Sequence, residues 1–271
     1  MKILIKDINI NYEIEGNGKP IILIHGYYPD HRLMKGCMEH IFEEYKNFKR
    51  IYIDLPGMGL SQSSEKIKNS DDMLDIVIEF IKKVIPDEKF LIAGESYGGY
   101  LTLGVINKMS EKVDGALLIC PVIIANPKKR TLPKHIVLEK EESLIIPKDE
   151  FGKSFEEFSV IQNEEIFKRY LNEVCEGVKL ADIKFLERIF NTGYEFSSNS
   201  FDEMSSFDKP SLFIMGRQDS VVGYKDAWDI LDKFPRTTFA VVDKAGHNLQ
   251  IEQKEIFDSL VKEWLNRVEK Y

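Results

Sequence analysis

Cysteine and histidine are scarce in this chain of 271 residues, and long apolar runs are missing. The three cysteines, Cys37, Cys120 and Cys175, are odd in number and far apart, which favours neither a disulfide framework nor a metal site. The best apolar stretch, residues 115–125, is interrupted by a proline and is too short to cross a membrane. Charged residues break the apolar run at the start too early for a signal peptide. We therefore expect a cytoplasmic protein without a membrane span, metal ion or organic cofactor.

Excess positive charge is also missing. The formal net charge is -8, which argues against nucleic acid or an anionic membrane as a partner, because both attract a basic surface. Hydrophobic residues make up 43% of the chain, and this length is ample for a full core. The composition indicates an ordinary globular protein. We expect a monomer or homodimer whose partner is a small molecule, although the composition does not determine either.

Short apolar strands and amphipathic helices alternate along most of the chain. A hairpin with a turn at Gly16–Gly18 is expected first, and one clear helix is expected over 71–85, capped by Ser70. Such alternation predicts an α/β fold with a mostly parallel sheet covered by helices on both faces. The remaining strands are expected at 20–24, 50–55, 89–93, 115–121, 211–215 and 237–242, and further helices at 31–45, 97–109, 224–234 and 251–268.

The alternation stops between residues 123 and 207, where helical stripes dominate and strand patterns are scarce. This block is too long for a loop in a compact domain. We expect it to be a helical cap inserted after the sixth strand, with residues 1–122 and 208–271 forming the core domain. Five of its aromatic residues are expected to pack mainly within the cap, with one or two of them lining the pocket: Phe151, Phe155, Phe158, Phe167 and Tyr170.

Ser96 lies in the pattern Gly94-Glu95-Ser96-Tyr97-Gly98, between a predicted strand and a predicted helix. A reversal this tight crowds its neighbours, so flanking glycines relieve the clash and the hydroxyl is pushed out beyond the end of the sheet. A glycine-rich turn whose serine only caps a helix is the alternative. A predicted strand precedes Ser96, a predicted helix follows it, and suitable partners lie further along the chain. This context favours a nucleophile.

A serine hydroxyl needs a base within hydrogen-bond reach. Of the five histidines, His247 follows the last predicted strand in a short glycine-containing loop. His25 is expected to bond neighbouring loops and His31 to be exposed at a helix start, while His40 and His135 lie in a helix and in the cap. We expect His247 to be the base, with activity rising as it loses its proton near the reference pKa of about 6.5.

An acid should orient the imidazole. Asp219 follows the strand 211–215, which gives the chain order serine, aspartate, histidine. Asp202 and Asp208 precede that strand, and Asp243 is close to His247 along the chain. Asp219 could also be only a helix cap, but the order favours the triad role.

Two backbone N–H groups should bind the oxyanion. One is expected from Tyr97, which follows the nucleophile, and the other from Tyr27, which follows the strand 20–24 and His25-Gly26. Asp54 and Ser61 are expected to stabilise the turn at 56–59 rather than to react, and Cys120 to be a small buried apolar residue.

Together these segments resemble the successive signatures of the α/β-hydrolase superfamily, in its capped branch of serine hydrolases. The resemblance covers nearly the whole chain outside the cap and implies an eight-stranded sheet. It rests on five segments: 25–29 (HGYYP), 54–61 (DLPGMGLS), 94–99 (GESYGG), 216–219 (GRQD) and 245–247 (AGH).

The resemblance implies a serine hydrolase that cleaves an ester or related acyl bond, in the manner of a carboxylesterase. Epoxide and haloalkane hydrolases of this superfamily carry aspartate where this chain has Ser96. Prolyl iminopeptidases typically have glycine and tryptophan where it has Glu95 and Tyr97, which weakens a peptidase function. A carbon–carbon bond hydrolase, an aminopeptidase and a ligand-binding receptor with slow turnover remain open.

Overall fold

A twisted sheet of eight strands forms the centre of the computed structural model, which describes residues 1–198, 201 and 204–270. The strand order is β1-β2-β4-β3-β5-β6-β9-β10. β1 and β2 pair antiparallel, as do β2 and β4, and every other pair is parallel. This confirms the predicted α/β fold with a mostly parallel sheet. The strands are β1 (Lys2–Ile5), β2 (Ile8–Glu15), β3 (Lys19–Ile24), β4 (Phe48–Ile53), β5 (Phe90–Glu95), β6 (Val113–Ile119), β9 (Ser211–Gly216) and β10 (Thr237–Val242).

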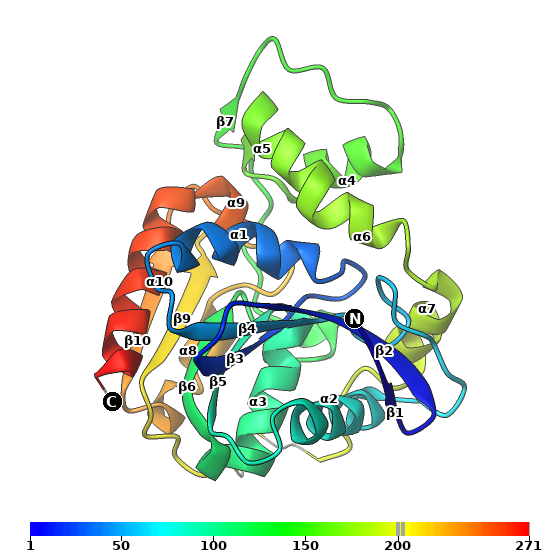
Figure 1. Cartoon of the computed structure of the whole chain (residues 1–271). Helices are drawn as coiled ribbons and strands as arrows, with labels where there is room; N and C mark the ends of the chain where they lie inside the picture. The colour runs from blue at the N-terminus through cyan, green and yellow to red at the C-terminus, as the bar shows by residue number, and fades with distance from the viewer. Residues whose placement is uncertain (199–200, 202–203, 271) are drawn as a thin grey trace.

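The central strands are apolar throughout because helices cover both of their faces. In β5 and β9 every residue is buried. Figure 1 shows α1 (Arg32–Phe42) and α10 (Lys254–Glu269) on one side of the sheet, and α2 (Ser70–Val84) and α3 (Tyr97–Met109) on the other. Because the strands are parallel, their carboxyl ends lie at one edge of the sheet, which is where a site is expected in such a fold.

The N-terminal hairpin differs from the prediction. Its turn is at Lys6 and Asp7, which both have positive φ, whereas Gly16 and Gly18 connect β2 to β3. These two strands are not neighbours, because β4 lies between them. The glycines allow a close approach instead: a side chain at Gly18 would overlap the backbone of Asn47.

Three expected helix boundaries were also wrong. Asn69, not Ser70, caps α2, by accepting a hydrogen bond from the N–H of Asp72. The segment 224–234 is broken into α8 (Lys225–Trp228) and a 3₁₀ turn (Leu231–Lys233), and the last helix is preceded by a separate short one, α9 (Leu249–Glu252). The spacing of apolar residues alone does not predict which residue caps a helix or where a helix is interrupted.

Between β6 and β9 the described residues form four α-helices and a small parallel pair of strands. Figure 1 shows α4, α5 and α6 gathered above the main body, with α7 beside it. The described side chains of this block divide between two buried clusters. Phe155, Phe167 and Tyr170 form a separate buried cluster, whereas Phe185 and Leu186 of α7 belong to the main core. The elements are β7 (Glu139–Lys140), α4 (Glu150–Phe158), β8 (Ile161–Gln162), α5 (Glu164–Tyr170), a π-helical turn (Leu171–Cys175), α6 (Glu176–Val178) and α7 (Ile183–Thr192).

We propose that residues 123–207 are the cap and that 1–122 and 208–271 are the core domain. Residues 199–200 and 202–203 of this block, including the candidate Asp202, lie outside the described residues. Of the helices formed by the described residues, none combines the length and apolar character that a membrane crossing requires.

Candidate active site

The predicted nucleophile Ser96 stands at the sharp turn between β5 and α3. Its φ of 53° and ψ of -114° are strained for a residue with a side chain. The flanking glycines make this turn possible. A Cβ at Gly94 would overlap the carbonyl oxygen of Gly98, and one at Gly98 would overlap the carbonyl oxygens of Ile24 and His25. The serine is held at the N-terminus of α3, where the helix dipole favours negative charge.

The structure brings Ser96, His247 and Asp219 into one hydrogen-bonded line. Nε2 of His247 lies 2.9 Å from Oγ of Ser96, and Nδ1 lies 2.9 Å from Oδ2 of Asp219. The other oxygen of Asp219 accepts the backbone N–H groups of Val221 (2.8 Å) and Val222 (3.0 Å). The geometry is that of a nucleophile, a base and an orienting acid.

Burial and charge act in opposite directions on this pair. Burial alone would raise the pKa of Asp219, but the charge and hydrogen bond of His247, helped by the N–H groups of Val222 and Val221, hold that pKa below its usual range. Burial alone would lower the pKa of His247, but Asp219 and then Glu95 raise that pKa to about 9. The reference value expected from sequence is therefore too low for this histidine.

The loop after β3 presents Tyr27, the predicted second oxyanion donor. Ring Nδ1 of His25 lies 2.7 Å from the carbonyl oxygen of Gly26, and ring Nε2 accepts the N–H of Leu55 at 3.0 Å. In a trans peptide the C=O and N–H groups point in opposite directions. Since the Gly26 carbonyl faces His25, the N–H of Tyr27 in the same peptide is directed away from that ring.

Tyr97, the other predicted donor, is the first residue of α3, where a backbone N–H has no acceptor within the helix. Its side chain serves packing: the ring stacks on Tyr194 at 4.9 Å, and its hydroxyl lies 2.8 Å from Oγ of Ser70. The Tyr27 hydroxyl donates to the carbonyl of Leu186 in α7. Both side chains are thus occupied elsewhere, which leaves only their backbone for an oxyanion.

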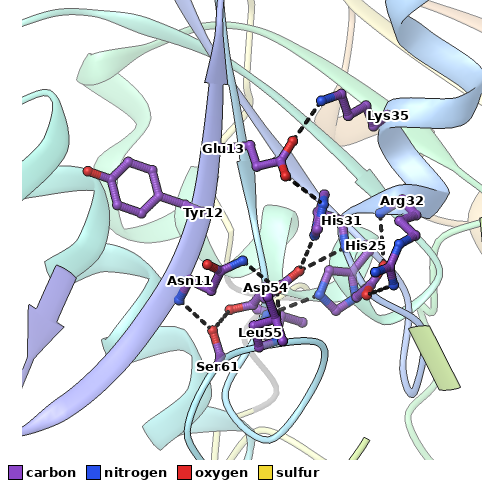
Figure 2. Close-up of polar contacts among 12 residues, drawn as sticks. Asn11, Tyr12, Glu13, His25, His31, Arg32, Lys35, Asp54, Leu55 and Ser61 are labelled. Atoms are coloured by element: carbon purple, nitrogen blue, oxygen red, sulfur yellow. Dashed lines mark hydrogen bonds and ion pairs between the residues drawn. The ribbon is translucent and has the colours of Figure 1, made fainter. Parts of the chain in front are cut away.

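A second polar cluster lies behind this loop, around the fully buried Asp54 (Figure 2). One carboxylate oxygen accepts the backbone N–H of His31 at 3.0 Å and lies 2.7 Å from its ring Nδ1. The other accepts from Asn11 at 2.8 Å and from the N–H of Leu60 at 3.0 Å. Asp54 and Ser61 therefore stabilise the turn, as predicted from sequence.

The prediction that His31 is exposed was wrong. Only 6% of His31 is exposed, and ring Nε2 lies 3.3 Å from a carboxylate oxygen of Glu13 while Lys35 bonds the other oxygen. Burial acts to lower the pKa of His31, but its hydrogen bond to Asp54 and the charges of Asp54, Asp30 and Glu13 raise that pKa overall. A position at a helix start did not indicate this buried partner.

A cavity of about 600 Å³ opens over Ser96 and His247, between the sheet and the cap. Its walls are mostly apolar and aromatic, which suits a small organic ligand. From the core side they include Tyr28, Leu33 and Val122, and from the cap Leu132, Phe158, Tyr170, Val174, Phe190 and Tyr194. Two of the aromatic residues expected to pack within the cap, Phe158 and Tyr170, thus also line the cavity.

The sequence analysis gave no role in the site to three charged residues that lie near it. Glu95 and Arg130 line the cavity, and Glu252 holds the His247 loop by accepting the N–H of Gly246 at 2.6 Å. Arg130 donates to three backbone carbonyls, which join the loop after β6 to the loop after Asp219. The nucleophile pattern itself contained a signal for Glu95, because a charged residue at the end of a buried strand is costly to bury without a partner.

In the part of the chain that the structure describes, two groups of side chains bring possible metal ligands close together: Cys120 with Asp219 and His247, and Asp30 with His31 and Asp54. In both groups the histidine and the carboxylate already bond each other. Burial raises the pKa of the Cys120 thiol far above its usual range, which disfavours the thiolate that a metal requires. These donors fit hydrogen-bonded pairs better than a metal, and the absence of a cofactor stays a prediction.

Comparison with known proteins identifies relatives along nearly the full chain. The family model described as "Serine aminopeptidase, S33" matches residues 18–254. An α/β superfamily hydrolase from Oenococcus oeni is 30% identical with a TM-score of 0.92, and the match covers 99% of both chains.

Two curated relatives are more distant. A 2-hydroxy-6-oxo-6-(2'-aminophenyl)hexa-2,4-dienoic acid hydrolase of Metapseudomonas resinovorans is 24% identical over 96% of this chain and 88% of its own. A pimeloyl-[acyl-carrier protein] methyl ester esterase of Legionella pneumophila is 20% identical over 95% of this chain and 100% of its own.

Proposed function

Because this chain belongs to the serine aminopeptidase S33 family of α/β-hydrolases, we propose that it cleaves a small-molecule ester or related acyl bond, with Ser96 as nucleophile. The observation that carries the proposal is the pair of 2.9 Å contacts that His247 makes, one to Ser96 and one to Asp219. A hydroxyl, an imidazole and a buried carboxylate in this order are the parts that acyl transfer requires.

In the proposed reaction, Nε2 of His247 takes the proton from Ser96 as Oγ attacks the substrate carbonyl. The backbone N–H groups of Tyr27 and Tyr97 bind the oxyanion that forms. The imidazolium then gives its proton to the leaving group, and Ser96 keeps the acyl group. Water finally attacks this acyl-enzyme, with His247 again as base. Asp219 stabilises the imidazolium in both halves and keeps the ring oriented.

The cavity supports a compact, largely apolar acyl substrate that enters between cap and sheet. Its volume of about 600 Å³ suits a small molecule. The esterase among the relatives supports ester cleavage, and the dienoic acid hydrolase supports a second candidate, cleavage of a carbon–carbon bond next to a carbonyl. A screen of nitrophenyl esters of increasing chain length, aminoacyl amides and vinylogous diketones separates these activities, since inertness to every ester would favour the second.

Labelling with a fluorophosphonate probe tests the nucleophile. We expect one label on the wild-type protein, located at Ser96 by peptide mass spectrometry, and none on Ser96→Ala. Ser220→Ala is the matched control, because Ser220 lines the same cavity and its loss should leave labelling intact. Persistent labelling of Ser96→Ala would overturn the assignment. A wild-type protein that releases one equivalent of nitrophenol and then stays acylated would instead favour the receptor function.

A further inference from the structure

Glu95 is a buried carboxyl group that faces the reacting atoms from the side opposite Asp219. It is the last residue of β5, and only 2% of it is exposed. Oε1 lies 3.5 Å from Nε2 of His247, the nitrogen that also contacts Ser96. On its other side, a Cβ at Gly26 would overlap Oε2. The carboxyl group is therefore wedged between the imidazole and the loop that carries Tyr27.

A charged group is costly to bury unless it is paired or hydrogen-bonded. The structure gives Asp219 two backbone N–H donors, and Glu252 has three. Among the described residues, the ion pair with His247 is the contact found for the Glu95 carboxylate. Glu95 also lines the cavity over Ser96, and its carboxylate has capacity left to accept a hydrogen bond there. A carboxylate held in this way next to a nucleophile is suited to accept a hydrogen bond from a molecule bound in the site.

We propose that Glu95 is a positioning residue for the second half of the reaction, in which it accepts a hydrogen bond from the hydrolytic water and stabilises the imidazolium at Nε2. The inference rests on the proposed serine-hydrolase function. It adds a second carboxylate to the triad. This carboxylate lies beside Nε2 of His247, the nitrogen that accepts and returns each proton in the proposed reaction.

The proton balance of the step is as follows. One water proton moves to Nε2 of His247 while the water oxygen bonds to the acyl carbon. The tetrahedral intermediate collapses, the bond between that carbon and Oγ of Ser96 breaks, and Nε2 returns its proton to Oγ. Burial raises the pKa of Glu95 to about 7, although the charge of His247 acts to lower it. Above that pH the carboxylate is charged, and it neither gains nor loses a proton over the step. Its negative charge lies beside the imidazolium in both halves of the reaction, whereas its hydrogen bond to the water exists only in the second half.

The charges around this pair determine the direction of the expected pH effect. A negative charge within about 4 Å favours the protonated imidazole and raises its pKa. Glu95→Gln removes that charge while the shape of the side chain is kept. The pKa of His247 then falls, and the basic form is reached at lower pH. The groups that act on the pair are Asp219 after β9, Cys120 after β6, Arg130 and Tyr194 of the cap, and Cys37 of α1.

Pre-steady-state hydrolysis of a nitrophenyl acyl ester tests the proposal. For Glu95→Gln we expect a burst rate within about threefold of wild type, because the hydrogen bond to water is absent from the first half. Steady-state turnover should be at least about tenfold slower, since the loss of a hydrogen bond to a charged group costs about this factor or more. The acyl-enzyme should accumulate on Ser96 by intact-protein mass spectrometry. The midpoint of the deacylation profile should move about one pH unit lower. Glu95→Asp, which keeps the charge, should recover part of the turnover and of the midpoint.

Glu187→Gln is the matched control, because it removes the same charge from an exposed position of α7 and should change neither quantity. Equal losses in burst and turnover without a midpoint shift would mean that Glu95 only supports the fold, and unchanged kinetics would mean that it does nothing. Either result overturns the inference. A wild-type protein that hydrolyses no ester and takes no fluorophosphonate label on Ser96 would instead overturn the proposed function itself.

Discussion

Asp219→Asn is the substitution whose effect the geometry defines most sharply. Oδ1 of Asp219 accepts two backbone N–H groups and Oδ2 faces Nδ1 of His247. In the asparagine variant the amide oxygen must keep the two backbone bonds, so the amide nitrogen turns toward the imidazole. Two donors cannot face each other. The ring therefore places its proton on Nε2, where it can no longer accept the proton of Ser96.

The size of the loss follows from the separation of the charges. At 2.9 Å, the carboxylate and the imidazolium attract each other by about 6 kcal/mol for an effective dielectric constant of about 20. A loss of this size corresponds to roughly a 10⁴-fold lower kcat, which is also the effect of the same substitution in other enzymes with this triad. Activation of Ser96 should fail while the fold persists.

The assay is steady-state ester hydrolysis, with the midpoint of urea denaturation measured beside it. Asp243→Asn is the matched control, because Asp243 was the competing acid and its carboxylate contacts the exposed side chain of Gln218 instead. We expect the control to keep the wild-type rate. An unchanged rate in Asp219→Asn, or a 10⁴-fold loss in Asp243→Asn, would refute the reasoning.

Two further predictions concern pH and stability. Because Asp219 and Glu95 raise the pKa of His247 to about 9, and only the neutral imidazole is a base, kcat/KM should increase with pH and reach half its maximum well above 6.5; a midpoint at or below 6.5 would contradict this cause. Asp54→Ala should lower the free energy of unfolding by about 3 to 5 kcal/mol, since it leaves His31 buried without its main partner. Urea denaturation measures this, and Asp7→Asn on the surface should change the free energy of unfolding by less than about 0.5 kcal/mol.

The sequence predicted the nucleophile turn well because its constraints are local. A buried strand, a helix start and two glycines occur within ten residues, and Gly94 and Gly98 are required by backbone atoms of this turn and of the adjacent strand. The parallel order of the strands then placed Asp219 and His247 at the same edge of the sheet. Their roles stay predictions, but their proximity was inferred from topology alone.

Contacts between distant segments could not be inferred in the same way. His31 was expected to be exposed because a helix start usually is, yet its partner Asp54 is 23 residues further along the chain. The helix expected over 224–234 failed for a similar reason, since its apolar spacing gave no sign of the break that packing imposes. Glu95 was noted only as a departure from the peptidase pattern, because its 3.5 Å approach to His247 spans more than half of the sequence.

The Asp54 cluster also affects the oxyanion site, through a contact that the sequence patterns around these segments do not indicate. Leu55 follows Asp54 directly, and its N–H donates to ring Nε2 of His25. This bond keeps Nδ1 of His25 as the nitrogen that carries the proton and directs it to the Gly26 carbonyl. The orientation of the peptide that offers the N–H of Tyr27 thus depends on the loop after β4. An oxyanion site works only when its donors are fixed before the reaction, so the residues that never touch substrate determine whether Ser96 can be used.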